Sequence, residues 1–471
     1  MDEDPLAIDP EVMRHIGYRV VDMLVDRMEA LEQDRPVRTA TREEMEHRLR
    51  ERSPEFPDDI DAILARLEAD VLPFMARWDH PRLFAFVPGA GTWPGALGDF
   101  VASALNVGAD LWRESAGGTM LELVVLDWFR EWIGMPQETA GLLVSGGSAA
   151  NMTAIACARE ALLGPMDERA VLYLSDESHS SLVRGARILG FRPEQVRVLP
   201  VDEDLRMRPE SLEDAIAADR RDGLKPLCVA ATAGSTSTGV VDPLSEIAAI
   251  SKAHEAWFHV DAAYGGFAVL TDRGKKALDG VELADSVTLD PHKWLSQSVE
   301  CGCLLVRDGA LLHQAFRMTP DYLKDTEGTM REVNLSDRGM QLTRGAARAF
   351  KLWMSISYFG VSAFRAAIDR SLDLAREAQR IIERSPEFDL VTPAWLSVVT
   401  FRRRSETVRD ENGIEALNAE LVGRLADSGQ GLISSTRVQG RYVLRLCVTN
   451  HTSRMRDVEH VLRWLEAQPV R

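Results

Sequence analysis

The sequence predicts an α/β protein with a mostly parallel sheet that helices cover on both faces. From about residue 140 to residue 306, apolar segments of roughly four to seven residues alternate with amphipathic segments of about ten, which is the pattern of parallel strands joined by helices. The chain has 471 residues, of which 45% are hydrophobic and 27% are charged, so it can build a large core. These observations exclude a disordered chain, a collagen and a small disulfide-stabilised fold.

Three units follow one another along the chain in this prediction, namely residues 1–80, 81–350 and 351–471. In the first, Asp9 is a suitable N-cap with Pro10 at the first helical position, and apolar residues then recur at helical spacing as far as Met28. A second helix is expected over 41–50. The apolar stripe covers either a neighbouring subunit or the core of its own domain, and the spacing alone leaves both open.

The elements of the other two units follow from the same patterns. In the central unit the expected strands are 141–144, 170–174, 195–201, 227–232, 257–262, 286–289 and 302–306. The helices expected between them are 149–162, 180–189, 211–219 and 244–256. The last unit is expected to be a small α+β domain, with helices at 349–359, 361–383, 414–425 and 456–467 and strands at 388–391, 396–402 and 442–448.

The charge balance and the cysteines exclude several kinds of partner and site. Lys and Arg total 55 against 73 Asp and Glu, a net charge of −18, so neither a nucleic acid nor an anionic membrane is an expected partner. The five cysteines are too scattered for a disulfide framework, and Cys301 and Cys303 lack the second pair of a zinc site, so no metal is expected. An acidic N-terminus without a long apolar run predicts a cytoplasmic protein.

Three segments directly after expected strands carry candidate functional residues. The segment Val144–Asn151 joins a strand to a helix through small residues that let backbone N–H groups approach an anion, although a tight turn is the simpler interpretation. Asp261 ends a buried strand, where a carboxylate is costly unless a cation or donors meet it; capping of a turn is the alternative. Lys293 lies between His292 and Trp294, and a lysine among bulky groups can act as a nucleophile, although a surface lysine is commoner.

The three segments together are more informative than each alone. An anion-binding turn, a buried acid and a nucleophilic lysine are what a pyridoxal-phosphate enzyme requires. The turn would bind the phosphate, Lys293 would form the Schiff base, and Asp261 would keep the pyridine nitrogen protonated.

Two motifs then connect the chain to a known family. With Asp290-Pro291-His292-Lys293-Trp294 and with the segment Ser175–Ser181, the chain resembles the group II pyridoxal-phosphate-dependent amino-acid decarboxylases of the aromatic-L-amino-acid decarboxylase branch, almost from end to end. The resemblance implies the type I (aspartate aminotransferase-like) fold, pyridoxal 5′-phosphate as cofactor, and a homodimer whose N-terminal helices cross to the partner. It also implies decarboxylation of an L-amino acid, aromatic by the same resemblance, to the amine and carbon dioxide.

The resemblance implies roles for individual residues. Lys293, His179 and Asp261 would be catalytic, with His179 stacked over the cofactor ring and orienting the carboxylate that leaves. The cofactor would be bound by these three and by Gly147, Ser148, Thr232, Ala263, Asp290 and His292. Phe86 and Trp93 would contact the substrate side chain, although two aromatic residues are more often plain core.

Two departures from the family pattern keep alternatives open. Relatives carry a loop Tyr that is implied to protonate the substrate carbon; here the position falls on Ser336 or Asp337, and Tyr322 lies too early in the loop. Without that hydroxyl, oxygen-dependent formation of an aldehyde, or another carbon–carbon lyase reaction, is the second hypothesis. Arg113 and Glu114 also stand where aromatic-specific relatives carry small residues, so they either contact a polar substrate group or pair with each other. An aminotransferase and a degenerate, non-catalytic relative are disfavoured by the motifs retained.

Overall fold

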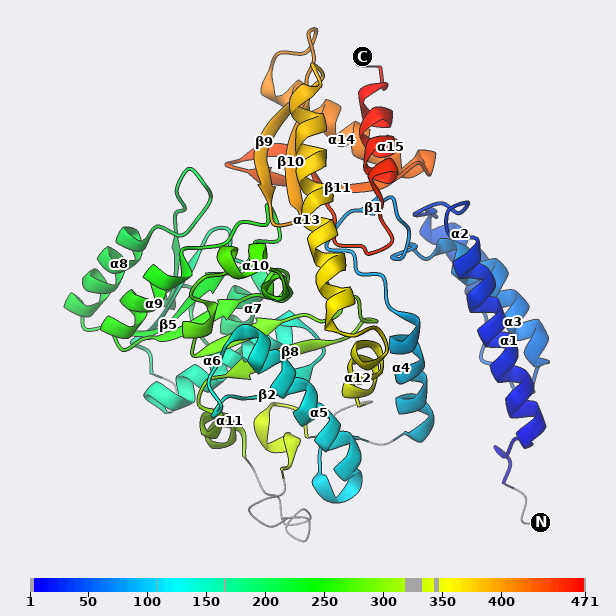
Figure 1. The fold of residues 1–471 in the computed structure, drawn as a ribbon, viewed down its shortest axis with the longest axis horizontal. Helices are drawn as coiled ribbons and strands as arrows, with labels where there is room; N and C mark the ends of the chain where they lie inside the picture. The colour runs from blue at the N-terminus through cyan, green and yellow to red at the C-terminus, as the bar shows by residue number, and fades with distance from the viewer. Residues whose placement is uncertain (1–3, 107, 165–166, 318–332, 343–346, 470–471) are drawn as a thin grey trace.

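The computed structural model describes residues 4–106, 108–164, 167–317, 333–342 and 347–469. It contains two β-sheets, each with its own helices, and a group of N-terminal helices at one side of the molecule (Figure 1). None of the helices in these residues is long and apolar enough to cross a membrane.

The larger sheet has seven strands in the order β2-β8-β7-β6-β5-β3-β4. Their bounds are β2 Ala140–Val144, β3 Ala170–Ser175, β4 Val196–Leu199, β5 Lys225–Thr232, β6 Trp257–Asp261, β7 Ser286–Leu289 and β8 Gly302–Val306. β8 is antiparallel to both of its neighbours, β2 and β7, and every other adjacent pair is parallel. The structure therefore confirms the predicted α/β class with a mostly parallel sheet.

Alternate residues of the strands enter two separate cores, one on each face of this sheet. One core combines strand residues such as Leu143 and Val260 with side chains from α5, α8, α9 and α12. The other combines residues such as Leu142 and Leu174 with side chains from α6, α7 and α11. These helices are α5 Trp112–Ile133, α6 Gly147–Leu163, α7 Ser180–Ile188, α8 Pro209–Arg221, α9 Leu244–Ala253, α11 Gly309–Phe316 and α12 Ala349–Phe359. Burial on both faces explains why the strands are nearly continuous apolar runs.

The smaller sheet has five strands in the order β1-β11-β12-β10-β9. Its strands are β1 Leu83–Phe84, β9 Phe388–Trp395, β10 Val398–Arg403, β11 Leu432–Val438 and β12 Arg441–Cys447, and its helices are α13 Val361–Arg384, α14 Glu411–Ser428 and α15 Met455–Glu466. β1 runs parallel to β11, so the chain contributes to this sheet before it enters the larger one. A third core, which includes Phe84, Phe401 and Leu462, lies between this sheet and its helices.

The remaining helices include those of the N-terminal segment. They are α1 Pro10–Glu29, α2 Arg42–Leu49, α3 Ile60–Arg66, α4 Trp93–Leu105 and α10 Asp272–Ala277. Asp9 caps α1 as predicted, because its side chain accepts a hydrogen bond from the Glu11 N–H. Thr41 caps α2 in the same way, so this helix begins and ends one residue inside the predicted range.

The sequence-based prediction of the elements did not include α3, α4, α5, α10 and α11, and it was wrong at a few other places. α6 begins at Gly147 and not at Ala149, because Gly147 and Ser148, which have poor helix propensity, nevertheless enter the helix. β11 was not predicted, since its run Leu-Ile-Ser-Ser-Thr-Arg-Val lacks a clean alternation of apolar and polar residues. β1 is only two residues long and gives no periodic signal.

The antiparallel strand β8 comes very close to the turn that follows β2. A Cβ atom built on Gly302 would lie 2.5 Å from Cα of Gly146 and 2.7 Å from its carbonyl carbon. Real Cβ atoms do not approach backbone this closely, so any larger residue at position 302 must displace the turn. The glycine in the Cys-Gly-Cys run is therefore explained by packing. The five cysteines are all buried, and none forms a disulfide.

We expect Gly302→Ala to lower the free energy of unfolding by about 1–3 kcal/mol, because the new methyl group overpacks the turn. The matched control is Gly117→Ala in α5, where no heavy atom lies within 4 Å of the new Cβ. This control should leave stability unchanged or raise it by up to about 1 kcal/mol, since alanine favours the helix. Thermal unfolding of both variants checks the prediction, and equal midpoints would contradict it.

Candidate active site

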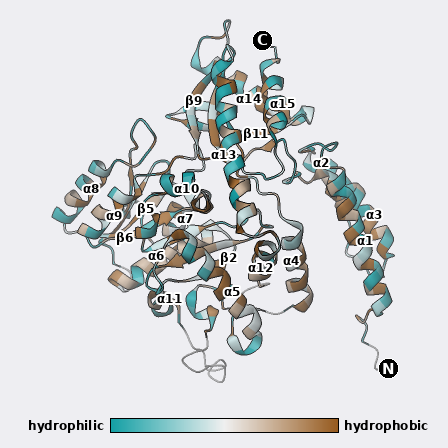
Figure 2. Cartoon of the chain, in the orientation of Figure 1, coloured by the Kyte–Doolittle hydropathy of each residue, from teal (hydrophilic) through white to brown (hydrophobic). Residues whose placement is uncertain are grey.

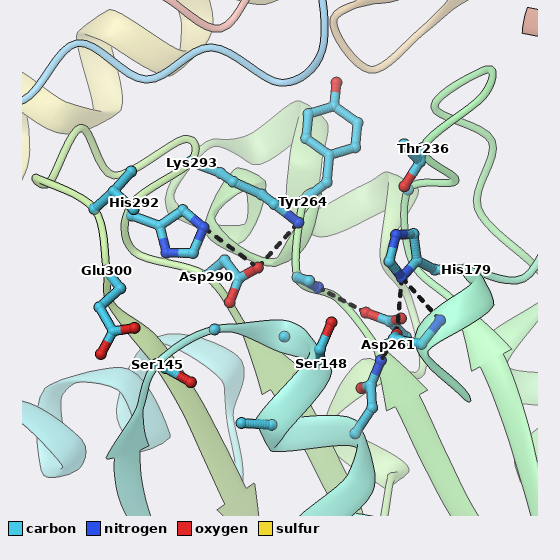
Figure 3. Close-up of a pocket in the computed structure, with 18 of the residues that line it drawn as sticks. Ser145, Ser148, His179, Thr236, Asp261, Tyr264, Asp290, His292, Lys293 and Glu300 are labelled. Atoms are coloured by element: carbon cyan, nitrogen blue, oxygen red, sulfur yellow. Dashed lines mark hydrogen bonds and ion pairs between the residues drawn. The ribbon is translucent and has the colours of Figure 1, made fainter. Parts of the chain in front are cut away.

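A cavity of about 420 Å³ opens at the carboxyl ends of β2, β5, β6 and β7, where ligands bind in sheets of this kind. Its walls come from the turn before α6, the segment before α7, and the connection between β7 and β8 (Figure 3). Of the nine residues predicted to be catalytic or cofactor-binding, all line this cavity: Gly147, Ser148, His179, Thr232, Asp261, Ala263, Asp290, His292 and Lys293. The structure therefore brings together three motifs that are far apart in the sequence.

One end of the cavity is formed by the N-terminus of α6. The N-cap of this helix is Gly146, whose lack of a side chain leaves the first N–H groups without a side-chain cap. A Cβ atom on Gly147 would lie 3.0 Å from Asp290 Oδ2, and one on Gly146 would lie 3.3 Å from His292 Cε1. Glycine at both positions thus keeps open a small space into which backbone N–H groups and the helix dipole point, which suits an anion.

Lys293 enters the cavity from the connection between β7 and β8. Its Nζ lies 2.9 Å from Asp290 Oδ2, and the Asp290 side chain is only 3% exposed. His292 Nε2 lies 3.8 Å from the same oxygen, and burial lowers the pKa of His292. In Figure 3, Lys293 points across the cavity towards the side where Asp261 and His179 lie. The lysine is thus a polar, ion-paired group and does not lie among apolar side chains alone.

Asp261 lies at the end of β6, where 7% of its surface is exposed. Its Oδ1 accepts a hydrogen bond from the Ala263 N–H at 3.2 Å, and its Oδ2 accepts one from Asn151 Nδ2 at 2.8 Å. Neither partner is a cation, so within the described residues the hydrogen bonds to the carboxylate come from neutral donors. A buried carboxylate in this position is suited to bind a cationic N–H group of a ligand.

His179 is the N-cap residue of α7 and lies on the same side of the cavity as Asp261 (Figure 3). Its Nδ1 lies 2.8 Å from Ser181 Oγ and accepts a hydrogen bond from the Ser181 N–H at 3.3 Å. Because Nδ1 is an acceptor, the proton of the neutral ring is on Nε2. His179 can therefore present an N–H group to a ligand in the cavity.

Two buried polar atoms on the cavity wall have no hydrogen-bond partner within the described part of the chain. They are Oγ1 of Thr232 and Oδ1 of Asp290. Buried polar groups in native proteins are nearly always paired, so unpaired ones in a cavity point to a ligand that completes them. Both atoms belong to residues that the sequence had predicted to contact a cofactor.

The two predicted substrate residues lie elsewhere. Phe86 and Trp93 do not line the cavity; Phe86 is 59% exposed and stacks on Trp78 with ring centroids 5.9 Å apart, and Trp93 is the first residue of α4. The segment between them nevertheless packs directly on the Lys293 connection, because a Cβ atom on Gly89 would lie 2.5 Å from the carbonyl oxygen of Lys293.

The loop that replaces the family tyrosine is described only in part. Tyr322 lies outside the described residues. Ser336 is 4% exposed in a short helix, Leu335–Arg338, and its N–H donates to the Asp110 carbonyl at 3.2 Å. Asp337 lies 3.6 Å from His313 Nε2. Ser336 and Asp337 do not line the cavity of this chain, and the same is true of Arg113 and Glu114 at the start of α5.

Sequence reasoning missed Asn151 and Ser181, which connect the predicted residues to one another. Asn151 lies in the quoted glycine-rich segment, and Ser181 in the quoted histidine segment, but neither had been assigned a role. A signal was present for Asn151, because it is a lone amide among the small apolar residues of a helix that faces the sheet. A second signal was His259, which lies two residues before Asp261 on a strand and hence on the same face.

The chain is similar to several known proteins. Residues 43–404 match the model of the pyridoxal-dependent decarboxylase conserved domain. The chain is 37% identical over 463 residues to an aromatic-L-amino-acid decarboxylase of Bacillus atrophaeus, covering 98% of this chain and 96% of the relative. It is 31% identical to a phenylacetaldehyde synthase of Arabidopsis thaliana, covering 94% and 92%. A crystal structure of Oryza sativa TDC with PLP and tryptamine superimposes with a TM-score of 0.92 at 30% identity, covering 98% of each chain.

The cofactor is therefore pyridoxal 5′-phosphate, and the cavity suits it. An uncapped helix N-terminus beside two glycines offers a place for an anionic phosphate, a buried carboxylate lies on another wall, and a lysine amine projects between them. The unpaired Thr232 Oγ1 would be available for a further polar contact with a bound group.

Glu177, two residues before His179, gives the site a pH-dependent stability. Burial, followed by the charges of Asp176 and Asp242, raises the pKa of Glu177 from 4.5 to about 7. Its Oε2 atom is buried with no hydrogen-bond partner in the described ranges. The folded state therefore binds this proton more tightly than the unfolded state, and ionisation of Glu177 removes stability as the pH rises from about 4.5 through about 7.

We expect Glu177→Gln, which cannot ionise, to raise the melting temperature relative to the wild type at about pH 8 but not at about pH 5. The control is Glu213→Gln, at an exposed position of α8. Its melting temperature should differ from that of the wild type by the same amount at both pH values. Thermal unfolding across this pH range measures the effect. If the melting temperatures of Glu177→Gln and the wild type differ by a constant amount across this pH range, Glu177 is already ionised in the folded protein and the prediction is contradicted.

Proposed function

The chain belongs to the pyridoxal-dependent decarboxylase family and is a pyridoxal-phosphate-dependent amino-acid decarboxylase, and on this basis we propose that it converts an aromatic L-amino acid to the amine and carbon dioxide. The observation that carries the proposal is the joint presence in one cavity of Lys293, Asp261, His179 and the glycine-rich N-terminus of α6. Each of these groups has a distinct task in the proposed reaction.

The first task is binding of the cofactor. Gly147 and Ser148 at the start of α6 would hold the phosphate through backbone N–H groups and the Ser148 hydroxyl, with Asp290 and His292 beside them. Lys293 Nζ would bind the cofactor carbonyl covalently until the substrate amine replaces it. Thr232 Oγ1 and the small side chain of Ala263 would contact the ring, and the unpaired state of Thr232 Oγ1 supports this.

The second task is control of protons during the loss of carbon dioxide. When bound, pyridoxal phosphate supplies an electron-accepting ring that stabilises the electron pair left on the substrate carbon. Asp261 would hold a proton on the ring nitrogen, because its buried carboxylate favours a cationic partner. His179, with its Nε2–H free to donate, would orient the departing carboxylate.

The aromatic substrate class is supported by the relatives and by the position of Phe86 near the Lys293 connection. The relatives named above include an aromatic-L-amino-acid decarboxylase and a structure that contains tryptamine. The exposed ring of Phe86 lies at the end of a segment that packs on the Lys293 connection, so Phe86, and with it Trp93, would contact an aromatic side chain. Arg113 and Glu114 have no assigned part in this proposal.

A second product is favoured by the missing tyrosine. An aldehyde would form if molecular oxygen oxidised the substrate carbon after decarboxylation; oxygen would become hydrogen peroxide, and water would release ammonia. Serine or aspartate at position 336 or 337 supports this route, and one relative is a phenylacetaldehyde synthase.

The test is incubation of the cofactor-loaded protein with aromatic and aliphatic L-amino acids, with quantification of amine, aldehyde, carbon dioxide, ammonia and peroxide. We expect amine and carbon dioxide in equal amounts from aromatic substrates, without peroxide. Aldehyde with peroxide and ammonia would establish the second product instead. Lys293→Ala should abolish turnover and the visible absorbance of the bound cofactor while keeping the far-ultraviolet circular dichroism. Absorbance that survives in this variant would contradict the role of Lys293.

We also propose that the protein is a homodimer whose N-terminal unit, residues 1–80, packs on the partner. α1 lies beside α2 and α3, apart from both sheets (Figure 1), and hydrophobic residues occur on both α1 and α4 (Figure 2). Only Met23 of α1 is buried, whereas Val12, Met13, Tyr18, Val21, Val25 and Met28 are exposed. A stripe of exposed apolar residues on a helix indicates that another surface covers it, here that of the partner subunit. The third core, between the smaller sheet and its helices, supports a division of the rest into units 81–350 and 351–471, although Phe84 joins that core and α12 packs in a core of the larger sheet.

Light scattering coupled to gel filtration should give a mass of twice 52.3 kDa. The variant Tyr18→Glu/Val25→Glu should shift the protein towards monomer, because it inserts two charges into the apolar stripe of α1. Asp22→Asn, an exposed polar change on the same helix, should leave the dimer intact. A monomeric wild type at micromolar concentration would contradict the proposal.

A cytoplasmic location remains part of the proposal. It is supported by the five unpaired, buried cysteines, since reducing compartments keep thiols free.

A further inference from the structure

We propose that Asn151 is a positioning residue. Through one directed chain of hydrogen bonds, it fixes the orientation of the Asp261 carboxylate and the tautomer of His179. The relay begins at Trp257 and passes through Ser286, His259 and Asn151 before it divides. This inference deepens the proposed function, on which it rests, because it concerns the residues that face the cofactor ring.

Asn151 lies at the point where the two branches separate. Its Nδ2 atom is 2.8 Å from Asp261 Oδ2 and 2.9 Å from Ser181 Oγ, and its Oδ1 atom is 3.0 Å from His259 Nε2. The side chain therefore uses both of its N–H groups and one lone pair of its oxygen. Asn151 is 1% exposed, so none of these contacts is shared with bulk solvent.

The upstream part of the relay is buried between β6 and β7. His259 Nδ1 lies 2.8 Å from Ser286 Oγ, and Trp257 Nε1 donates to the same oxygen at 2.8 Å. His259 and Ser286 are register partners on the two adjacent strands, and both are fully buried. Burial also lowers the pKa of His259 to about 4, so the ring is neutral at physiological pH.

Chemistry allows only one direction for these hydrogen bonds. The carboxylate of Asp261 can only accept, so the Asn151 amide places its nitrogen towards the cavity and its oxygen towards His259. The neutral His259 ring must then carry its proton on Nε2 and donate to that oxygen. His259 Nδ1 is left as the acceptor of the Ser286 hydroxyl, whose oxygen in turn accepts from Trp257 Nε1.

At the other end, both branches finish on acceptors of the cavity wall. One N–H of Asn151 meets the carboxylate of Asp261 and the other meets Ser181 Oγ, whose hydroxyl proton is then directed to His179 Nδ1. The relay thus sets the orientation of a carboxylate and the tautomer of an imidazole at the same time.

This arrangement has a consequence for the bound cofactor. A hydrogen bond donated to a carboxylate stabilises its charged form, so Asn151 favours a proton on the ring nitrogen over a proton on Asp261. Without Asn151, Asp261 would compete more strongly for that proton, so the bound cofactor would be a poorer electron acceptor. The nitrogen that links Lys293 to the cofactor would also be more basic.

The experiment compares cofactor-loaded wild type with Asn151→Leu, which keeps the size of the side chain and removes both donors. The first readout is the pH at which the visible absorbance of the Lys293-bound cofactor titrates, and the second is kcat. We expect the titration midpoint to rise by about one pH unit or more and kcat to fall roughly ten- to hundredfold, the range for a lost hydrogen bond to a charged group. Ser181→Ala removes only the His179 branch, so it should lower kcat by about three- to tenfold and leave the midpoint unchanged.

The matched control is Thr153→Val on the same helix. Thr153 is buried and donates only to the Ala149 carbonyl of its own helix, at 2.8 Å. This variant should change neither the midpoint nor kcat. If Asn151→Leu loses thermal stability but keeps the wild-type midpoint and kcat, Asn151 only packs the core and the proposal is overturned.

Asn151→Asp keeps the test decisive if the leucine variant does not fold. A protonated carboxyl group can donate to Asp261 and accept from His259, whereas its ionised form repels Asp261. The activity of Asn151→Asp relative to the wild type should therefore rise as the pH falls. A constant ratio overturns the proposal.

Asp261→Asn separates failure of the relay from failure of the proposed function. If Asp261→Asn shifts the absorbance midpoint and Asn151→Leu does not, the relay is wrong while the role of Asp261 stands. If neither variant shifts the midpoint, the proposed role of Asp261 itself is wrong, and the relay with it.

Discussion

A carboxylate that is withdrawn from water is the constraint around which this site is built. Asp261 ends the central strand β6 of the larger sheet, and no cationic side chain is among its hydrogen-bond partners in the described structure. A charge in that position requires donors, and the nearest element that can supply them is α6, which packs across the same face. Asn151 lies one helical turn after Gly147, so the residue that meets the acid and the turn suited to an anion belong to the same rigid helix. The separation between the two ends of the ligand site is therefore fixed by α-helical geometry and not by loops.

The elements of the fold were largely predictable, whereas the connections within the site were not. Continuous apolar runs predicted β5 and β6 because both faces of the sheet are buried, and the motif around Lys293 predicted its place at a strand end. The start of α6 was misplaced because Gly147 and Ser148 are poor helix formers, and glycine at position 147 follows from a close approach to Asp290 and Ala263 that no local pattern shows. Asn151 and His259 are 108 residues apart in the sequence, and a hydrogen bond between them leaves no local pattern.

The two sheets meet at the wall of the cavity, not at a distance from it. Tyr264, which follows Asp261 in the same segment, stacks on Trp294 with ring centroids 5.2 Å apart, next to Lys293. Its hydroxyl group lies 2.5 Å from Ser397 Oγ in the turn between β9 and β10. Gly265 and Gly239 lack side chains where this turn approaches, since a Cβ atom on Gly239 would lie 2.3 Å from the Trp395 carbonyl oxygen. A shift of the smaller sheet would thus be transmitted to the segments that carry Asp261 and Lys293.

The antiparallel strand β8 limits how far the Lys293 amine can move. Because β7 and β8 are hydrogen-bonded neighbours, the connection that carries Lys293 starts and finishes at the same place in the sheet, as in a wide hairpin. Such a connection is anchored at both ends, so the amine can travel only as far as its own four-carbon chain allows. In the proposed reaction, Lys293 Nζ would stay close to the cofactor carbonyl after the substrate amine replaces it, so rebinding would be an intramolecular reaction at a high effective concentration. Release of product would then need no movement of the sheet, because the antiparallel pair β7 and β8 would keep the lysine in place.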